Sequence, residues 1–367
     1  MSVAGGILGF SQSPSMLRAH VEFLASDDMS GRSCPSKFCD LTADYVLAHF
    51  RGAGLQTQVQ TTEELTEIRR GDVTLEPKTL KFKPQDVVFD IPAVLNSDST
   101  IKTRFGGVVI DQNPELEAIY KASGDTRVTH VPAGLRNVIG VLKGSSPLLR
   151  DQYVIVSAHY DHIGEKNDGE GDRVFNGAND DASGVSSLIE VARALAASPV
   201  KPRRSVVFIA YFGEERGLVG SRYYGRFPVF PIEKTYAQVN FEQLGRTDDT
   251  EGARVAAATL TGWDRSDVGP ILAAAAKPFG VRIYKHEKYS EEFFARSDNE
   301  ALAKQKVPAH TLSVAYEFPD YHGLKDEADK LDYANMSKIA RALRAGILTL
   351  ANRPGKLQLR DPKPEKE

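Results

Sequence analysis

From Arg136 onward, short apolar runs alternate with segments of helical periodicity, and this alternation limits the fold more than any other feature of the chain. Several of these runs are apolar at nearly every position, which is typical of parallel strands buried on both faces. The runs are NVIGVL, YVIVSAHYD, SVVFIAYFG, AQVNFEQ and AHTLSVAY. One helix between them is indicated by apolar residues on a single face: Val185, Leu188, Ile189, Ala192 and Leu195. The pattern predicts an α/β fold, with a doubly wound, mixed and mostly parallel sheet flanked by helices.

A different pattern precedes this alternation. Ser13-Pro14 predicts an N-cap with proline in the first helical turn, and a second helix is expected to end near Gly52. Residues 58–135 contain short alternating runs between turn residues, such as LKFKP and DVVFDIPAVL, which predict a small β-rich insertion. Within the insertion, NPELEAIYKASGD favours one helix.

We therefore expect a main domain made of residues 1–57 and 136–353, interrupted by the insertion over residues 58–135. A final helix is predicted from about residue 335 to about residue 352, where apolar residues recur at helical spacing. Residues 354–367 are charged and contain several prolines. Such a composition cannot bury a core and predicts a disordered tail.

Charge and hydropathy exclude several classes of partner. The chain has 46 basic and 49 acidic residues, a net charge of −3, so no bulk electrostatic attraction draws it to nucleic acid or to an anionic membrane. No apolar run approaches the roughly 20 residues of a membrane span. Hydrophobic residues make up 41% of the chain, which is typical of a globular protein. The oligomeric state is not indicated by the sequence.

The cysteines and the N-terminal residues bear on the cellular location. Cys34 and Cys39 lie in SCPSKFC, whose spacing permits one local disulfide, and two free thiols are equally compatible with it. The opening residues lack a basic region and a cleavage site, so they do not form a functioning signal peptide. We expect a secreted or periplasmic protein whose signal segment is absent from this chain, with a cytoplasmic location as the alternative.

Polar side chains crowd the ends of the predicted strands, where open α/β sheets place their ligand sites. They are His159, Asp161, Asp180, Asp181, Glu214, Glu215, Glu242 and His322. Each alone has an ordinary explanation: a histidine can lie in the core, a carboxylate before a helix can cap it, and adjacent glutamates usually face solvent. Glu242 is harder to explain, because a carboxylate at the end of a strand that carries the apolar Val239 and Phe241 does not contribute to core packing. Together the imidazoles and carboxylates suit two divalent cations, with Zn²⁺ the leading candidate.

The order of these motifs resembles a known family. H-x-D, D-D-x-S-G, G-E-E, N-x-acid and Y-H-x-x-x-D follow one another as in the clan MH di-zinc aminopeptidases of the bacterial leucine-aminopeptidase type. The same wider group includes glutamate carboxypeptidase and glutaminyl cyclase. The resemblance covers about residues 136–352 and extends to HVEFLASDDMSGRS and ADYVLAHFRGAGL near the N-terminus. It implies a zinc-exopeptidase (phosphorylase/hydrolase-like) fold and hydrolysis of peptide substrates.

The resemblance also implies a ligand set for two zinc ions per chain. His159, Asp180 and Glu242 would bind one zinc. Asp180, Glu215 and His322 would bind the other, with Asp180 bridging the two. This chain departs from the common pattern at Glu242, where the family usually has the shorter aspartate.

Three further carboxylates take other roles by the same resemblance. Glu214 would be the general base that activates water for attack on the peptide bond. Asp161 would hold the ring of His159 and its tautomer, and Asp326 matches a trailing aspartate that supports the site.

Several positions near these motifs have a less definite role. Asn299 stands where the family often has a histidine, outside the implied ligand set. His162 is a candidate for contact with substrate, and Trp263 is expected in the core. The insertion has no clear match to the protease-associated domain of many relatives.

The leading hypothesis is a metallo-aminopeptidase that removes N-terminal residues from peptides. A carboxypeptidase or dipeptidase specificity remains open. A glutaminyl-cyclase-like acyltransferase is the nearest enzymatic alternative, and the intact His159 and Asp161 speak against it. A metal-free binding module on the same fold is the alternative from another class, but such a module should have lost ligands that this chain retains.

Overall fold

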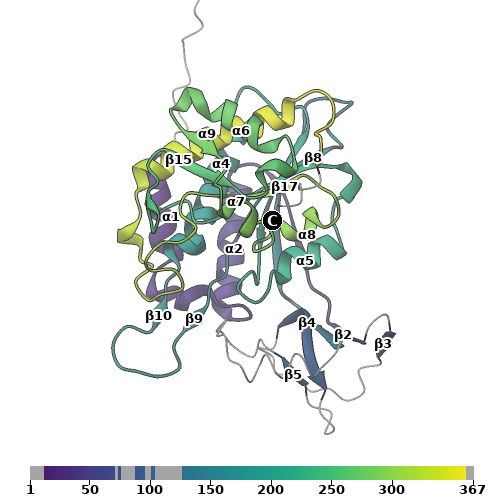
Figure 1. Ribbon diagram of the computed structural model, residues 1–367, viewed down its shortest axis with the longest axis vertical. Helices are drawn as coiled ribbons and strands as arrows, with labels where there is room; N and C mark the ends of the chain where they lie inside the picture. Colours follow the sequence, from purple (N-terminus) through teal and green to yellow (C-terminus); the bar gives the residue numbers. More distant parts are fainter. Residues whose placement is uncertain (1–11, 71–72, 76–86, 96–100, 104–125, 361–367) are drawn as a thin grey trace, which may run out of the picture.

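An eight-stranded sheet with helices on both faces forms the main body of the computed structural model (Figure 1). The structure describes residues 12–70, 73–75, 87–95, 101–103 and 126–360. The strands of the main sheet are β1 (Gln56–Thr61), β7 (Arg136–Leu142), β8 (Tyr153–His159), β11 (Ser205–Tyr211), β12 (Thr235–Phe241), β15 (Ala257–Leu260), β16 (Arg282–Tyr284) and β17 (Ala309–Ser313). Their order across the sheet is β1-β7-β11-β8-β12-β17-β15-β16.

The centre of this sheet is parallel. Strands β11, β8, β12 and β17 pair in parallel, whereas β1 with β7, β7 with β11, and β15 with β17 pair antiparallel. The predicted mixed and mostly parallel sheet is confirmed. Because the four central strands run the same way, their carboxyl ends meet at one edge.

Helices cover the two faces of the sheet. One face packs against α1 (Pro14–Leu24), α2 (Lys37–Gly52), α4 (Gly184–Ala196), α6 (Val268–Ala276) and α9 (Tyr333–Asn352). The other packs against α5 (Val219–Arg226) and α8 (Glu300–Ala303), while α7 (Tyr289–Glu292) is a single turn. Short helical turns are η1 (Asp27–Arg32), η2 (Ala178–Ser183), η3 (Ile232–Lys234), η4 (Trp263–Arg265), η5 (Lys277–Phe279) and η6 (Ala328–Lys330).

The central strand β11 is almost continuously apolar because both of its faces are buried. In β11, Val206 and Phe208 point into the larger core beneath α4 and α9. Their neighbours Val207 and Ile209 point into the smaller core with α5 and α8. Alternate side chains of a strand point to opposite faces, so two covered faces require a continuous apolar run.

Helix α1 begins as its sequence predicts. The side chain of Ser13 accepts a hydrogen bond from the backbone N–H of Met16 at 3.2 Å, and Pro14 occupies the first helical turn. Ser36 caps α2 in the same way by accepting from the N–H groups of Phe38 and Cys39. Each cap satisfies donors that the first turn of a helix leaves unpaired.

The insertion starts later than expected. Gln58 lies within β1, where it pairs with Ile139 of β7 in the main sheet, so this edge strand belongs to the main body. A separate five-stranded sheet follows, made of β2 (Leu65–Arg70), β3 (Val73–Leu75), β4 (Val88–Leu95), β5 (Ile101–Thr103) and β6 (Thr126–Val131). It lies at the bottom of Figure 1, and the helix favoured over NPELEAIYKASGD falls outside the described residues.

Part of the predicted disordered tail is ordered against the main body. Leu359 forms a β-bridge with Ser266, and the side chain of Arg360 forms an ion pair with Asp267 just before α6. The residues beyond Arg360 are outside the described part of the chain. The expectation of a wholly disordered tail was therefore wrong for the stretch up to Arg360, because backbone pairing and an ion pair fix it.

Three other expectations concern single residues. Cys34 and Cys39 form a disulfide, with their Cα atoms 5.2 Å apart. Trp263 is partly buried and packs against the larger core, as expected. Among the described residues, no helix combines the length and the apolar character that crossing a membrane requires. Short two-stranded ribbons, β9 (Gly164–Glu165) with β10 (Val174–Phe175) and β13 (Asp248–Asp249) with β14 (Gly252–Ala253), complete the fold.

Candidate metal centre

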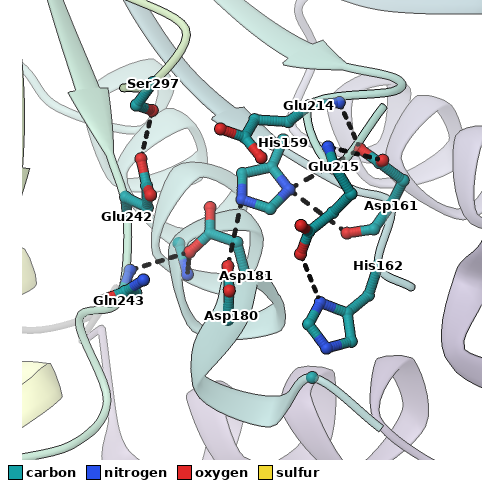
Figure 2. Close-up of polar contacts among 12 residues, drawn as sticks. His159, Asp161, His162, Asp180, Asp181, Glu214, Glu215, Glu242, Gln243 and Ser297 are labelled. Atoms are coloured by element: carbon teal, nitrogen blue, oxygen red, sulfur yellow. Dashed lines mark hydrogen bonds and ion pairs between the residues drawn. The ribbon is translucent and has the colours of Figure 1, made fainter. Parts of the chain in front are cut away.

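Three neighbouring parallel strands deliver the candidate residues to one edge of the sheet. His159 is the last residue of β8. Glu214 and Glu215 follow β11 after a turn at Gly213, and Glu242 follows β12 directly. Because β11, β8 and β12 are adjacent, these side chains converge where open α/β sheets place their ligands (Figure 2).

Asp180 lies between two imidazoles. It comes from the irregular turn η2 that leads into α4. Its Oδ1 is 3.3 Å from Nε2 of His159, and its Oδ2 is 3.2 Å from Nε2 of His322. Each carboxylate oxygen therefore faces a different histidine, which is the arrangement that a bridging carboxylate needs.

His322 reaches the site from the loop after β17. Its Nε2 is also 3.1 Å from Oε2 of Glu215, so one nitrogen faces two carboxylates. The ring stacks on Tyr321, with centroids 4.0 Å apart, and its side chain is 31% exposed. This histidine is thus held on the open side of the cluster.

The donor atoms fit a divalent cation. The Nε2 atoms of His159, His162 and His322 are all buried without a hydrogen-bond partner. Ligand atoms of His159, Asp180 and Glu242 lie within 4.8 Å of one another, and so do those of His162, Asp180 and Glu215. Imidazole nitrogen and carboxylate oxygen are the donors that zinc prefers alongside thiolate. Buried imidazole nitrogens that face carboxylates and have no hydrogen-bond partner suit a bound cation.

Asp161 connects His159 to the glutamate pair. Its carboxylate accepts hydrogen bonds from the backbone N–H groups of Glu214 and Glu215, at 3.1 and 3.3 Å. Nδ1 of His159 lies 3.6 Å from the same carboxylate and 3.2 Å from the backbone carbonyl of Asp161. Nδ1 therefore faces acceptors, so Nε2 remains the free nitrogen toward Asp180.

The two adjacent aspartates have different partners. The peptide bond between Asp180 and Asp181 is cis. Oδ1 of Asp181 accepts from the backbone N–H of Gly184 at the start of α4 and from that of Gln243 after β12, each at 3.0 Å. Capping, the ordinary explanation for this pair, thus applies to Asp181, which leaves Asp180 for the cluster.

Asp326 fixes the backbone on which Asp180 stands. Its carboxylate accepts from the N–H of Asn179 at 2.9 Å and from the N–H of Asp180 at 3.0 Å. Burial raises the pKa of Asp326 to about 6, against these hydrogen bonds. The carboxylate thus supports the site through the backbone rather than by facing the cluster.

Arg32 was not predicted as part of the site. It is 1% exposed, and its guanidinium donates to the backbone carbonyls of Leu24, Tyr160, Asn176 and Gly177. One buried side chain therefore ties the N-terminal segment to the residue after His159 and to the turn before η2. The only sequence signal was its place in the motif SGRS.

The carboxylates of the cluster are strongly perturbed. Burial raises the pKa of Glu214 well above its ordinary range, and the neighbouring Glu242 and Glu215 add to the rise against the opposing effect of His159. Burial likewise raises the pKa of Glu242 to about 8. Burial alone would lower the pKa of His322, but Glu215 and Asp180 raise it to about 11. The cluster therefore favours positive charge at its centre.

Two neighbours hold Glu242 and the adjoining loop. Ser297 donates from its hydroxyl to the Glu242 carboxylate, and the amide of Asn240 lies 3.4 Å from the same oxygen. Asn299 is buried outside the cluster, where it bonds the backbone of Phe294 and the hydroxyl of Thr311, as its position outside the implied ligand set predicts. Ser297 was missed, because nothing in its local sequence marks it.

The fold and this cluster define a protein of the α/β class with a candidate metal centre at the strand ends. The family model of peptidase family M28 matches residues 137–347, which is more than half of the chain. The chain therefore belongs to peptidase family M28.

Curated relatives match shorter stretches. A probable zinc metalloprotease of Pyrenophora teres f. teres (strain 0-1) is 32% identical over 148 residues, covering 40% of this chain and 30% of the relative. Aminopeptidase YwaD of Bacillus subtilis (strain 168) is 36% identical over 110 residues, covering 30% of this chain and 20% of the relative. The chain thus spans less than a third of the length of these two relatives.

Solved structures of similar fold cover almost the whole chain. The aminopeptidase from Aneurinibacillus sp. strain AM-1 has a TM-score of 0.61 and 18% identity, covering 96% of this chain and 97% of that one. BSAP, a zinc aminopeptidase from Bacillus subtilis, has a TM-score of 0.64 and 14% identity, covering 92% and 95%. A glutaminyl cyclase from Bacteroides thetaiotaomicron has a TM-score of 0.58 and 16% identity, covering 92% and 98%. At these identities the likeness concerns the fold.

Proposed function

We propose that this peptidase is an aminopeptidase that holds two zinc ions. The observation that carries the proposal is the division of Asp180, whose two oxygens face Nε2 of His159 and Nε2 of His322 separately. Each histidine lies beside a further carboxylate, Glu242 on one side and Glu215 on the other. One zinc is assigned to His159, Asp180 and Glu242, and the other to Asp180, Glu215 and His322.

Membership of family M28 supports the choice of metal, because several relatives are described as zinc metalloproteases. Bound zinc lowers the pKa of water and polarises a carbonyl oxygen, which is the chemistry that peptide hydrolysis at neutral pH requires. The protein supplies the proton transfers and the positioning.

Glu214 is assigned the role of general base. It takes a proton from the attacking water and returns it to the nitrogen of the leaving amine. The carboxylate of Asp161 holds Glu214 in place through its backbone N–H, so Asp161 acts by positioning.

An amino-terminal specificity is supported by hydrogen-bond acceptors beside the cluster. The carboxyl groups of Glu214 and Glu242 are partly buried on the same side of it. Their oxygens can accept hydrogen bonds from the free amino group at the start of a peptide. The description of one relative as an aminopeptidase agrees with this preference.

We also propose that the protein works outside the cytoplasm. The disulfide between Cys34 and Cys39 is buried. Disulfides persist mainly in oxidising compartments, which supports a secreted or periplasmic location.

The proposal is tested by assaying the purified protein on three substrates. The first is a peptide with a free amino terminus, the second is the same peptide with its amino terminus blocked, and the third is a peptide that begins with glutamine. Release of the first residue from the free peptide alone is expected. Cleavage of the blocked peptide would indicate a carboxypeptidase. Cyclisation of the glutamine peptide without hydrolysis would favour the glutaminyl-cyclase alternative, to which one of the similar structures belongs.

A further inference from the structure

His162 lies beside the second half of the cluster, and the roles assigned so far do not use it. It follows β8 by three residues, and its side chain is fully buried. Its Nδ1 is 2.7 Å from Oε1 of Glu215 (Figure 2). The ring packs so closely on Gly177 that a Cβ there would lie 2.5 Å from Cγ of His162. Gly177 also has φ +59°, so glycine is required at this position for both reasons.

The hydrogen bond has a defined direction. An ionised carboxylate can only accept, so Nδ1 of His162 carries the hydrogen and donates it to Glu215. A carboxylate that binds a metal is ionised, so the bond from His162 to Glu215 is charge-assisted.

The two oxygens of Glu215 have separate partners. Oε1 accepts from His162, and Oε2 lies 3.1 Å from Nε2 of His322. Oε2 is therefore the oxygen on the side of Asp180 and His322. Oε1 is occupied by a ring that packing against Gly177 holds in place.

We propose that His162 is a positioning residue that holds Oε1 of Glu215, so that Glu215 presents Oε2 alone to the cation bound with His322. The inference rests on the proposed function in that it assumes a cation at that place. Without His162, the Glu215 carboxylate could rotate and offer either oxygen or both. Partners that orient a metal ligand typically contribute about 10–100-fold to metal affinity.

Direct coordination by His162 is the competing explanation, because its ligand atom lies within 4.8 Å of those of Asp180 and Glu215. The geometry favours positioning, since Nδ1, the nitrogen that faces Glu215, is already bonded to Oε1, and the unpartnered Nε2 points away from Glu215. The two explanations differ in what can replace the imidazole. Positioning needs only an N–H at the place of Nδ1, whereas coordination needs the ring nitrogen itself.

Two variants of similar size separate these explanations. In His162→Asn the side-chain amide nitrogen occupies the place of Nδ1 and can still donate. In His162→Leu no donor remains. His310→Asn, which changes a buried histidine away from the cluster, is the control for loss of an imidazole.

The measurement is zinc affinity and stoichiometry, by competition with a chromophoric chelator, together with the absorption spectrum of the Co²⁺-loaded proteins. We expect His162→Leu to weaken one of two sites by about 10–100-fold. We expect His162→Asn and His310→Asn to stay within about threefold of the parent, with an unchanged Co²⁺ spectrum for His162→Asn.

Other outcomes overturn the inference in distinct ways. If His162→Asn loses as much affinity as His162→Leu and alters the Co²⁺ spectrum, His162 is a ligand. If His162→Leu binds both ions like the parent, His162 has no role at the site. A parent protein that binds fewer than two ions contradicts the proposed function instead, and this is known before any variant is measured.

Discussion

His310 in β17 should make the fold sensitive to acid. It is 1% exposed, its Nδ1 donates to the carbonyl of Thr261 at 2.8 Å, and its Nε2 is 2.6 Å from Oγ of Ser266. Because Nδ1 carries the hydrogen of the neutral ring, Nε2 accepts from the hydroxyl of Ser266, whose Oγ also accepts from the N–H of Val268. Burial, only partly offset by the bond to Thr261, lowers the pKa of His310 to about 4. A second proton on the ring, at Nε2, would bury a positive charge and would force the hydroxyl of Ser266 to turn and accept instead of donate.

The sign and the magnitude follow from linkage. An unfolded histidine has a pKa of about 6.5, so on acidification the unfolded chain takes up the proton before the folded one. The stability is fully present above about pH 6.5 and is lost as the pH falls toward about 4. A difference of about 2.5 between the two pKa values corresponds to about 3 kcal/mol, of which about 2 kcal/mol is lost between about pH 7.5 and about pH 5.

The assay compares the parent protein with His310→Asn, whose amide can still donate to the carbonyl of Thr261. The free energy of unfolding is measured by urea denaturation at both pH values. Effects of acid on the metal centre are common to both proteins and cancel in the difference. We expect the parent to lose about 2 kcal/mol more than the variant. Equal losses would refute the reasoning, because His310 would then titrate alike in both states.

Three further predictions concern the centre and the disulfide. Glu214→Gln should retain both metals and the fold but lose about 10²–10⁴-fold in turnover, measured by kinetics and metal analysis; an emptied metal site would mean that Glu214 is a ligand. Glu242→Ala should weaken zinc at the His159 site first, and Glu242→Asp should change substrate preference as well as rate; two tightly held zinc ions in Glu242→Ala would place the ligand elsewhere. Thiol titration of the unreduced, denatured protein should find neither Cys34 nor Cys39 free, and two titratable thiols would count against both the bridge and an exported origin.

The sheet was predictable where burial on both faces forces a continuous apolar run. Strands β15 and β16 were not predicted, because runs of four and three residues are too short to show a period. Strand β1, with the sequence QTQVQT, is polar because it lies at the edge of the sheet. Its pattern therefore matched the insertion better than the core.

The sequence predicted which strand ends carry the site, but it did not predict which side chains contact one another there. That carboxylates and imidazoles follow adjacent parallel strands is visible in the sequence. Which of Asp180 and Asp181 faces the histidines depends on the course of the turn before α4, and two identical neighbours give no local signal. The contact of His162 with Glu215 joins loops that are 53 residues apart, so only the fold brings it about.

The most direct test of the central claim is a zinc titration of the metal-free protein, followed by activity on an amino-terminal amide and by thermal unfolding. Activity should appear only with added zinc and reach its plateau at about two ions per chain. The melting temperature should rise over the same range, because metal bound only by the folded state adds its binding free energy to folding. Full activity of a chelated protein that takes up no zinc would contradict the claim.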